Sequence, residues 1–131
     1  MAEAEFFIGI DNGTQSTKTI IVNGDTGEVV GKATKAYGLI EGLPPGHKEQ
    51  DSAVWIDALH DTIKRALKDA KISPKDVKAI GVSGQQHGLV PLDRHGGVIR
   101  PVKLWNDTST IKECEYLTRK LGGVKAVIEL M

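Results

Sequence analysis

The sequence predicts an α/β domain in which helices flank a mixed sheet. The chain has 131 residues, which is the length of one domain. Three short runs rich in apolar and β-branched residues, separated by polar turns, come first. Helical periodicity appears only after them, and a further apolar run follows the first helical segment. The expected order of the elements is therefore βββαβ.

Three strands are predicted in the first 40 residues. Phe6–Asp11 is a nearly continuous apolar run ending in an acid, as in a strand that is buried on both faces. Thr17–Val22 is rich in β-branched residues, which favour strands. Glu28–Tyr37 follows the turn residues Asn23–Gly27, so two consecutive hairpins are expected.

One long helix is predicted next. Asp51 or Ser52 can cap its N-terminus, and Ser73–Pro74 ends it after about Lys71. Its apolar side chains recur along one stripe, as in a helix that buries one face; they are Trp55, Leu59, Ile63, Ala66, Leu67 and Ala70.

The rest of the chain predicts one strand, one hairpin and one helix. Val77–Ser83 is the fourth strand, and turn residues in the middle of Leu89–Ile99 indicate a hairpin. The second helix is expected from Thr108 to Leu121. Residues 122–131 begin a further apolar-periodic segment without a cap, so we expect the chain to be truncated at its C-terminal end.

Composition and charge exclude several classes of protein. Lys plus Arg and Asp plus Glu each total 17, so no net basic field attracts nucleic acid or an anionic membrane. The single cysteine, Cys114, excludes an internal disulfide and is expected to pack in the core. No apolar run approaches the roughly 20 residues that span a bilayer, and the first five residues lack the basic region of a secretory signal. A cytoplasmic protein is expected.

The segment Asp11–Thr17, with the sequence DNGTQST, is a candidate phosphate loop. Gly13 permits a tight turn whose backbone N–H groups converge, and neighbouring hydroxyl groups add donors. Asp11 at the strand tip can hold Mg²⁺ through water. The segment is not a P-loop, because the G-K-[ST] sequence is missing and a strand follows. An ordinary Asx-rich hairpin turn is the alternative.

Four segments in the same order resemble the FGGY family of carbohydrate kinases. Phe7–Lys18 is similar to the first phosphate motif of that family and of its superfamily, which includes actin, hexokinase and heat-shock-70 ATPases. The other three are Gly46–Asp51 with Trp55, the turn Ile80–Gly88, which is most similar to that of the xylulokinases, and Leu104–Asp107. The resemblance implies a ribonuclease H-like fold. It also implies that residues 1–131 are the sugar-binding N-terminal domain of a longer kinase, without the second, nucleotide-binding lobe.

The resemblance also assigns roles to individual residues. Those expected at the ATP phosphates are Asp11, Gly13, Thr14, Gln15 and Ser16, with Mg²⁺ held by Asp11 through water. Those expected at the sugar are Gln86, His87, Trp105, Asn106 and Asp107. Without the resemblance, His87 reads as a turn histidine. Trp105 could stack its ring on the sugar or pack in the core. The catalytic base is an aspartate in the missing C-terminal part, so this chain alone is expected to be inactive.

The reaction implied is ATP-dependent phosphorylation of a sugar hydroxyl, and D-xylulose, converted to D-xylulose 5-phosphate, is the first choice of sugar. Glycerol-specific relatives tend to carry Arg-Glu where this chain has Gln86-His87. Many relatives also place an arginine two residues after the Trp-x-Asp element, where this chain has Thr108-Ser109-Thr110, so any anchoring of an anion by that arginine is absent or moved. Glycerol, ribulose or a non-catalytic sugar-binding module are the alternatives. Homodimerisation of the full-length enzyme stays open.

A second class of enzyme is suggested by Asp25-Thr26-Gly27, the short signature of aspartic proteases. In those enzymes two aspartates lie side by side in a covered active site. Here the three residues lie in a polar turn after Asn23-Gly24, which argues against that reading.

Overall fold

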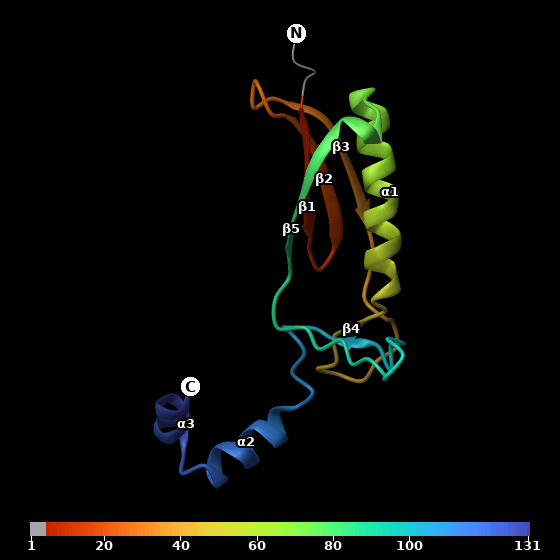
Figure 1. The fold of residues 1–131 in the computed structure, drawn as a ribbon. Coiled ribbons are helices and arrows are strands. Elements are labelled where there is room, and N and C mark those ends of the chain that lie inside the picture. The colour runs from red at the N-terminus through yellow and green to blue at the C-terminus, as the bar shows by residue number, and fades with distance from the viewer. Residues whose placement is uncertain (1–4) are drawn as a thin grey trace.

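A four-stranded mixed sheet forms the body of the protein in this computed structural model, which describes residues 5–131 (Figure 1). The strands are β1 (Phe6–Asn12), β2 (Ser16–Asn23), β3 (Val29–Ala36) and β5 (Val77–Gly84), in the order β3-β2-β1-β5. β2 is antiparallel to both β1 and β3, whereas β1 and β5 are parallel. The predicted order βββαβ and the mixed sheet are confirmed.

The helix α1 (Ala53–Ala70) covers one face of this sheet (Figure 1). Alternation along the strands turns Ile8, Ile10 and Ile21 into the core beneath it, where they pack with Ala66 and Leu67 of the helix. Asp51, rather than Ser52, caps the helix, because the Asp51 carboxylate accepts the Ala53 N–H at 2.9 Å.

The backbones of β3 and α1 approach each other closely at Gly31. A Cβ atom at this position would lie 2.5 Å from the Ala66 carbonyl oxygen and 2.8 Å from the Ala70 nitrogen. Such distances are far below van der Waals contact, so only glycine fits between the sheet and the helix.

A second, two-stranded sheet lies beyond the end of the first (Figure 1). It pairs β4 (Glu49–Gln50) with β6 (Val102–Lys103), and the sequence did not predict either strand. In the expected Leu89–Ile99 hairpin a single bridge, Leu92 to Val98, forms. The start of that segment pairs with β6 instead.

The C-terminal part consists of α2 (Ile111–Lys120) and α3 (Val124–Leu130), which extend away from the body (Figure 1). A 3₁₀ helix, η1 (Pro74–Asp76), precedes β5. α2 begins three residues later than predicted. The backbone N–H groups of Thr108 and Ser109, before it, donate to the Gly46 carbonyl and the Asp107 carboxylate.

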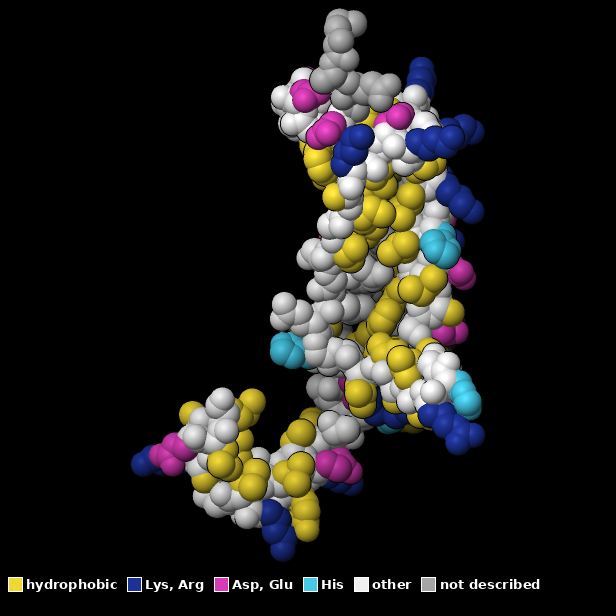
Figure 2. Space-filling model, in the orientation of Figure 1, with side chains coloured by type: hydrophobic (Ala, Val, Ile, Leu, Met, Phe, Trp, Pro, Cys, Tyr) yellow, Lys and Arg dark blue, Asp and Glu magenta, His cyan; other side chains and the backbone are white. Residues whose placement is uncertain are grey.

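The space-filling view shows hydrophobic side chains on α2 and α3, and between the β5 edge and α1 (Figure 2). The prediction that Cys114 packs in a core is wrong, since α2 buries none of its residues and this thiol is exposed. Within residues 5–131, no helix is long and apolar enough to cross a membrane. Residues 1–4, most of the segment compared above with a secretory signal, lie outside the described residues.

Candidate active site

The hairpin between β1 and β2 forms an open loop. The Gly13 N–H donates to the Ser16 carbonyl at 3.0 Å, and the Tyr37 N–H donates to the Gln15 carbonyl at 3.0 Å. Within the described residues, the N–H groups of Thr14 and Gln15 donate to no other backbone carbonyl. Backbone N–H groups without an acceptor in a turn are suited to donate to the oxygens of an anion.

Tyr37, the residue that follows β3, makes hydrogen bonds to this loop. Its hydroxyl donates to the Gly13 carbonyl oxygen at 2.6 Å and lies 3.0 Å from Asn12 Oδ1. A tyrosine hydroxyl is protonated at neutral pH and can donate, and burial raises the pKa of Tyr37 further. The sequence analysis did not single out Tyr37, because nothing local distinguishes it from other strand-end tyrosines.

Asp11 lies at the tip of β1 and borders an open cavity of about 340 Å³. Lys18 borders the same cavity, and its Nζ is 3.8 Å from Asp11 Oδ2. All five residues predicted at the ATP phosphates line this cavity together with two predicted at the sugar: Asp11, Gly13, Thr14, Gln15, Ser16, Trp105 and Asn106. An incoming anion would therefore meet backbone donors, hydroxyl groups and one lysine.

The turn after β5 borders a neighbouring cavity of about 280 Å³, which is lined by Gln85 and His87 among others. His87 has a φ of 60°, a left-handed conformation that is uncommon for a residue with a Cβ atom. Such conformations cost about 1–3 kcal/mol and are found most often at functional sites. Gln86 is exposed and is not among the residues that line this cavity.

Hydrogen bonds join the two loops directly. The Thr14 hydroxyl donates to Gln85 Oε1 at 2.9 Å, and Trp105 Nε1 donates to the same hydroxyl oxygen at 3.2 Å. The Gln85 N–H also donates to the Asn12 carbonyl at 3.0 Å. The indole of Trp105 is 60% exposed, so it is not a core residue, and its ring borders the 340 Å³ cavity.

The buried side chain of Gln50 contacts both the candidate phosphate loop and the turn after β5. Its side chain is fully buried, and its Nε2 donates to the Thr14 carbonyl at 2.7 Å and to the Gly38 carbonyl at 3.1 Å. Its Oε1 accepts from Trp55 Nε1 at 3.0 Å and lies 3.5 Å from Gln85 Nε2. The sequence analysis placed Gln50 in a family motif but assigned it no role.

Asn106 carries a free acceptor close to the candidate phosphate loop. Its Oδ1 is buried and has no hydrogen-bond partner within the described residues, and the residue borders both the 340 Å³ cavity and a smaller one beside it. Buried polar atoms are rarely left unpaired. This oxygen is therefore suited to accept a hydroxyl group of a ligand.

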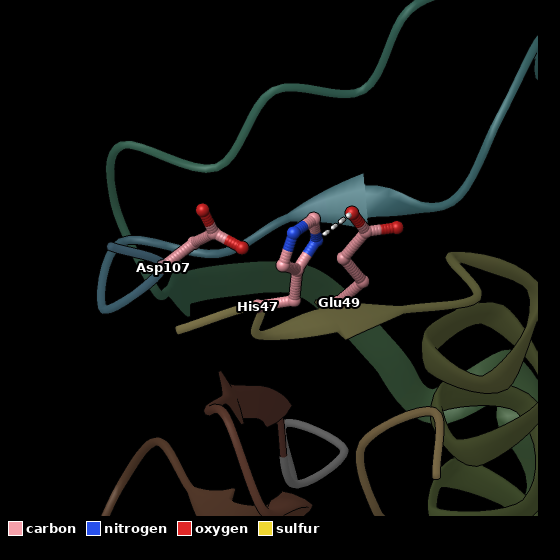
Figure 3. Close-up of side chains that lie close together, drawn as sticks. All are labelled: His47, Glu49 and Asp107. Carbon is pink, nitrogen blue, oxygen red and sulfur yellow. Dashed lines mark ion pairs between the residues drawn. The ribbon is translucent and has the colours of Figure 1, made fainter. Parts of the chain in front are cut away.

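Asp107 lies apart from these cavities, in a cluster with His47 and Glu49 (Figure 3). Its carboxylate accepts the Lys48 backbone N–H at 2.7 Å and is 3.4 Å from Lys103 Nζ. A cavity of about 530 Å³ borders Asp107 and residues of α2. A contact between Asp107 and a sugar thus stays a prediction, whereas its contacts here hold the turn that presents Trp105 and Asn106.

The three side chains in Figure 3 could in principle ligate a metal, since their candidate ligand atoms lie within 4.8 Å of one another. The Glu49 carboxylate is already paired with two cations. Arg100 Nη2 is 2.6 Å and Lys103 Nζ is 3.3 Å from Glu49 Oε1. The cluster is therefore a buried ion-pair network that ties β4 to β6.

Replacing Lys103 with methionine is expected to lower the free energy of unfolding by about 2 kcal/mol, because two buried carboxylates lose a charged donor. The hydrogen bond from Arg100 lowers the pKa of Glu49. Burial alone would raise the pKa of Asp107, but hydrogen bonds from Ser109 and from the Lys48 backbone outweigh it and hold this pKa well below its usual range. Their stabilisation is therefore complete above pH about 4.5 and is lost as the pH falls below it.

Urea denaturation at pH 7 and pH 3 checks this prediction. The difference between wild type and Lys103→Met should shrink at the lower pH, because the native carboxylates of the variant have lost the Lys103 donor and take up protons at a higher pH than those of wild type. Lys64→Met, which removes an exposed lysine from α1, is the matched control and should change the stability by less than about 0.5 kcal/mol. Equal effects of the two substitutions at pH 7 would contradict the role given to Lys103.

Comparisons with known proteins show the family of this chain. The sequence model of the FGGY family of carbohydrate kinases, N-terminal domain, matches residues 6–130. A xylulose kinase of Haemophilus influenzae is 45% identical over 127 residues, which cover 94% of this chain and 26% of that protein. The chain thus spans about a quarter of the length of this curated relative.

Two solved structures share the fold. The gluconate kinase of Lactobacillus acidophilus has a TM-score of 0.80 at 26% identity, over 90% of this chain and 23% of that one. The xylulose kinase of Rhodospirillum rubrum has a TM-score of 0.79 at 29% identity, over 90% of this chain and 24% of that one. The predicted ribonuclease H-like α/β fold is thereby confirmed. The chain belongs to the FGGY family of carbohydrate kinases, and it matches the N-terminal domain of that family.

Proposed function

We propose that this chain is the N-terminal, sugar-binding domain of a longer kinase that transfers the γ-phosphoryl group of ATP to a hydroxyl group of a pentulose, with D-xylulose as the substrate. The observation that carries the proposal is the hydrogen bond between Thr14 and Gln85, which places the candidate phosphate loop beside the candidate sugar turn. Phosphoryl transfer requires little of a protein beyond such positioning and the neutralisation of charge.

Different residues of this site would bind the phosphate oxygens, the metal ion and the sugar. The free N–H groups of Thr14 and Gln15 and the Lys18 ammonium group would hold phosphate oxygens. The exposed Asp11 carboxylate suits Mg²⁺ bound through water, and Mg²⁺ would neutralise charge on the transferred phosphoryl group. His87 and Asn106 would fix the hydroxyl groups of the sugar. We assign the catalytic base to the part of the kinase beyond this chain.

Isothermal titration of the 131-residue chain with D-xylulose, D-ribulose, glycerol and gluconate tests the sugar assignment. We expect binding of D-xylulose, with a dissociation constant at least about tenfold lower than those of the others, because each well-placed hydrogen bond contributes about 0.5–1.5 kcal/mol. His87→Ala should abolish that preference. Equal affinity for all four compounds, or a preference for glycerol or gluconate, would overturn the choice of sugar.

A coupled assay tests the reaction. The chain alone should show no turnover with D-xylulose and Mg-ATP. A chimaera in which it replaces the matching segment of the Haemophilus influenzae xylulose kinase should phosphorylate D-xylulose. Turnover by the isolated chain would contradict the assignment of the base, and an inactive but folded chimaera would contradict the kinase role of this domain.

A further inference from the structure

We propose that Gln85 couples the two halves of the site, so that occupation of the phosphate loop strengthens sugar binding. This role of Gln85 rests on the proposed function, and the family resemblance does not assign it. It follows from the hydrogen-bonding capacity of three side chains, namely Thr14, Gln85 and Gln50.

The Thr14 hydroxyl has a single hydrogen, and this hydrogen is already donated to Gln85 Oε1 at 2.9 Å. Trp105 Nε1 can only donate a hydrogen bond. It donates to the Thr14 hydroxyl oxygen and cannot accept the hydrogen of that hydroxyl. A phosphate oxygen is also only an acceptor. Phosphate can therefore bind the Thr14 hydroxyl only if the hydroxyl releases Gln85.

Gln85 cannot simply rotate to find another partner. Its Nε2 lies 3.5 Å from Gln50 Oε1, which also accepts from Trp55, so the amide of Gln85 presents its oxygen toward Thr14. Gln50 is itself fixed, because it is fully buried and both hydrogens of its amide are donated to backbone carbonyls. If the Thr14 hydroxyl breaks its hydrogen bond to Gln85, Gln85 Oε1 stays in place and has no donor.

A sugar hydroxyl is the donor that can replace Thr14. Gln85 lines the 280 Å³ cavity beside His87, where the sugar is proposed to bind. A partly buried acceptor that has lost its donor favours any ligand that restores the hydrogen bond. Phosphate that accepts the Thr14 hydroxyl hydrogen therefore raises the affinity for a sugar, and by linkage the sugar raises the affinity for phosphate by the same factor.

Titrations of the 131-residue chain test this coupling, with inorganic tripolyphosphate and Mg²⁺ as the probe for the phosphate loop. The dissociation constant for D-xylulose should fall about 2- to 10-fold when the probe is present, which is the contribution of one hydrogen bond. Fluorescence of Trp55 and Trp105 provides a second readout, because both indole N–H groups belong to the network.

Two variants separate coupling from simple binding. Gln85→Met keeps the length of the side chain but removes the amide, so the probe should no longer change the affinity for D-xylulose. Gln86→Met, at the exposed neighbouring position, should leave the factor produced by the probe intact, whatever its effect on the affinity for D-xylulose itself.

The possible failures are distinguishable. If the wild-type chain binds both ligands without mutual effect, or if the effect persists in Gln85→Met, the coupling role is wrong while the proposed function stands. If the folded chain binds neither D-xylulose nor the probe, the proposed function is wrong and the coupling role falls with it.

Discussion

Replacing Asp11 with alanine is expected to lower the turnover of the chimaeric kinase at least about 100-fold, the usual cost of removing one group that stabilises charge in the transition state. Asp11 is exposed at the tip of β1, borders the phosphate cavity and has only Lys18 as an ionic partner within the described residues. The fold does not depend on this carboxylate, so the thermal midpoint of the variant should stay within a few degrees of wild type.

Two companion substitutions make this result specific. Asp11→Asn keeps the size of the side chain and should be nearly as impaired, because Mg²⁺ needs the charge. Asp25→Ala removes an exposed acid from the turn between β2 and β3 and should leave the activity unchanged. If Asp11→Ala retained more than about a third of the wild-type turnover, Asp11 would have no part in holding the metal or the phosphates.

Replacing Gly31 with alanine is expected to destabilise the chain by about 3 kcal/mol or more, which is a large part of the stability of an ordinary domain. The added Cβ would meet the backbone of α1 at 2.5 Å and 2.8 Å, and backbone atoms cannot move aside as a flexible side chain can. The sheet and the helix would have to separate and lose the packing of Ile21 and Ala66. Urea denaturation followed by circular dichroism measures the loss.

Gly81→Ala is the matched control, since this glycine also lies in a strand of the sheet but has no atom within 4 Å of the position of a Cβ. Alanine should be neutral there or stabilise the chain by about 0.5–1 kcal/mol, because glycine loses more backbone entropy on folding. A similar effect of alanine at both positions would contradict the close approach at Gly31.

The main sheet and α1 could be predicted from the sequence because their signals are local. Phe6–Asp11 and Val77–Ser83 are compact apolar runs, and the stripe from Leu59 to Ala70 has helical spacing. The pairing of β4 with β6 could not be predicted, because two-residue strands have no periodicity. These strands are brought together across about 50 residues of sequence by the contacts of Glu49 with Arg100 and Lys103.

The candidate site could be predicted in part for the same reason. The phosphate loop is a continuous segment, so its predicted residues stand together in the sequence, and the structure places all of them on one cavity: Asp11, Gly13, Thr14, Gln15 and Ser16. The role of a residue such as Gln50 depends on partners at positions 14, 38, 55 and 85, and no local pattern reveals them. Asp107 was expected at the sugar, yet the Lys48 N–H and Ser109 draw its carboxylate inward.

The central claim is that the β1–β2 loop and the turn after β5 form one site for phosphate and sugar. Amide chemical shifts of the ¹⁵N-labelled chain, recorded during titration with D-xylulose and with Mg-tripolyphosphate, test it most directly. We predict that the sugar shifts Gly84–Gly88, that the polyphosphate shifts Asp11–Ser16, and that Thr14 and the Trp105 indole respond to both. Shifts confined to α2 and α3, or two sets of residues without a common member, would contradict the claim.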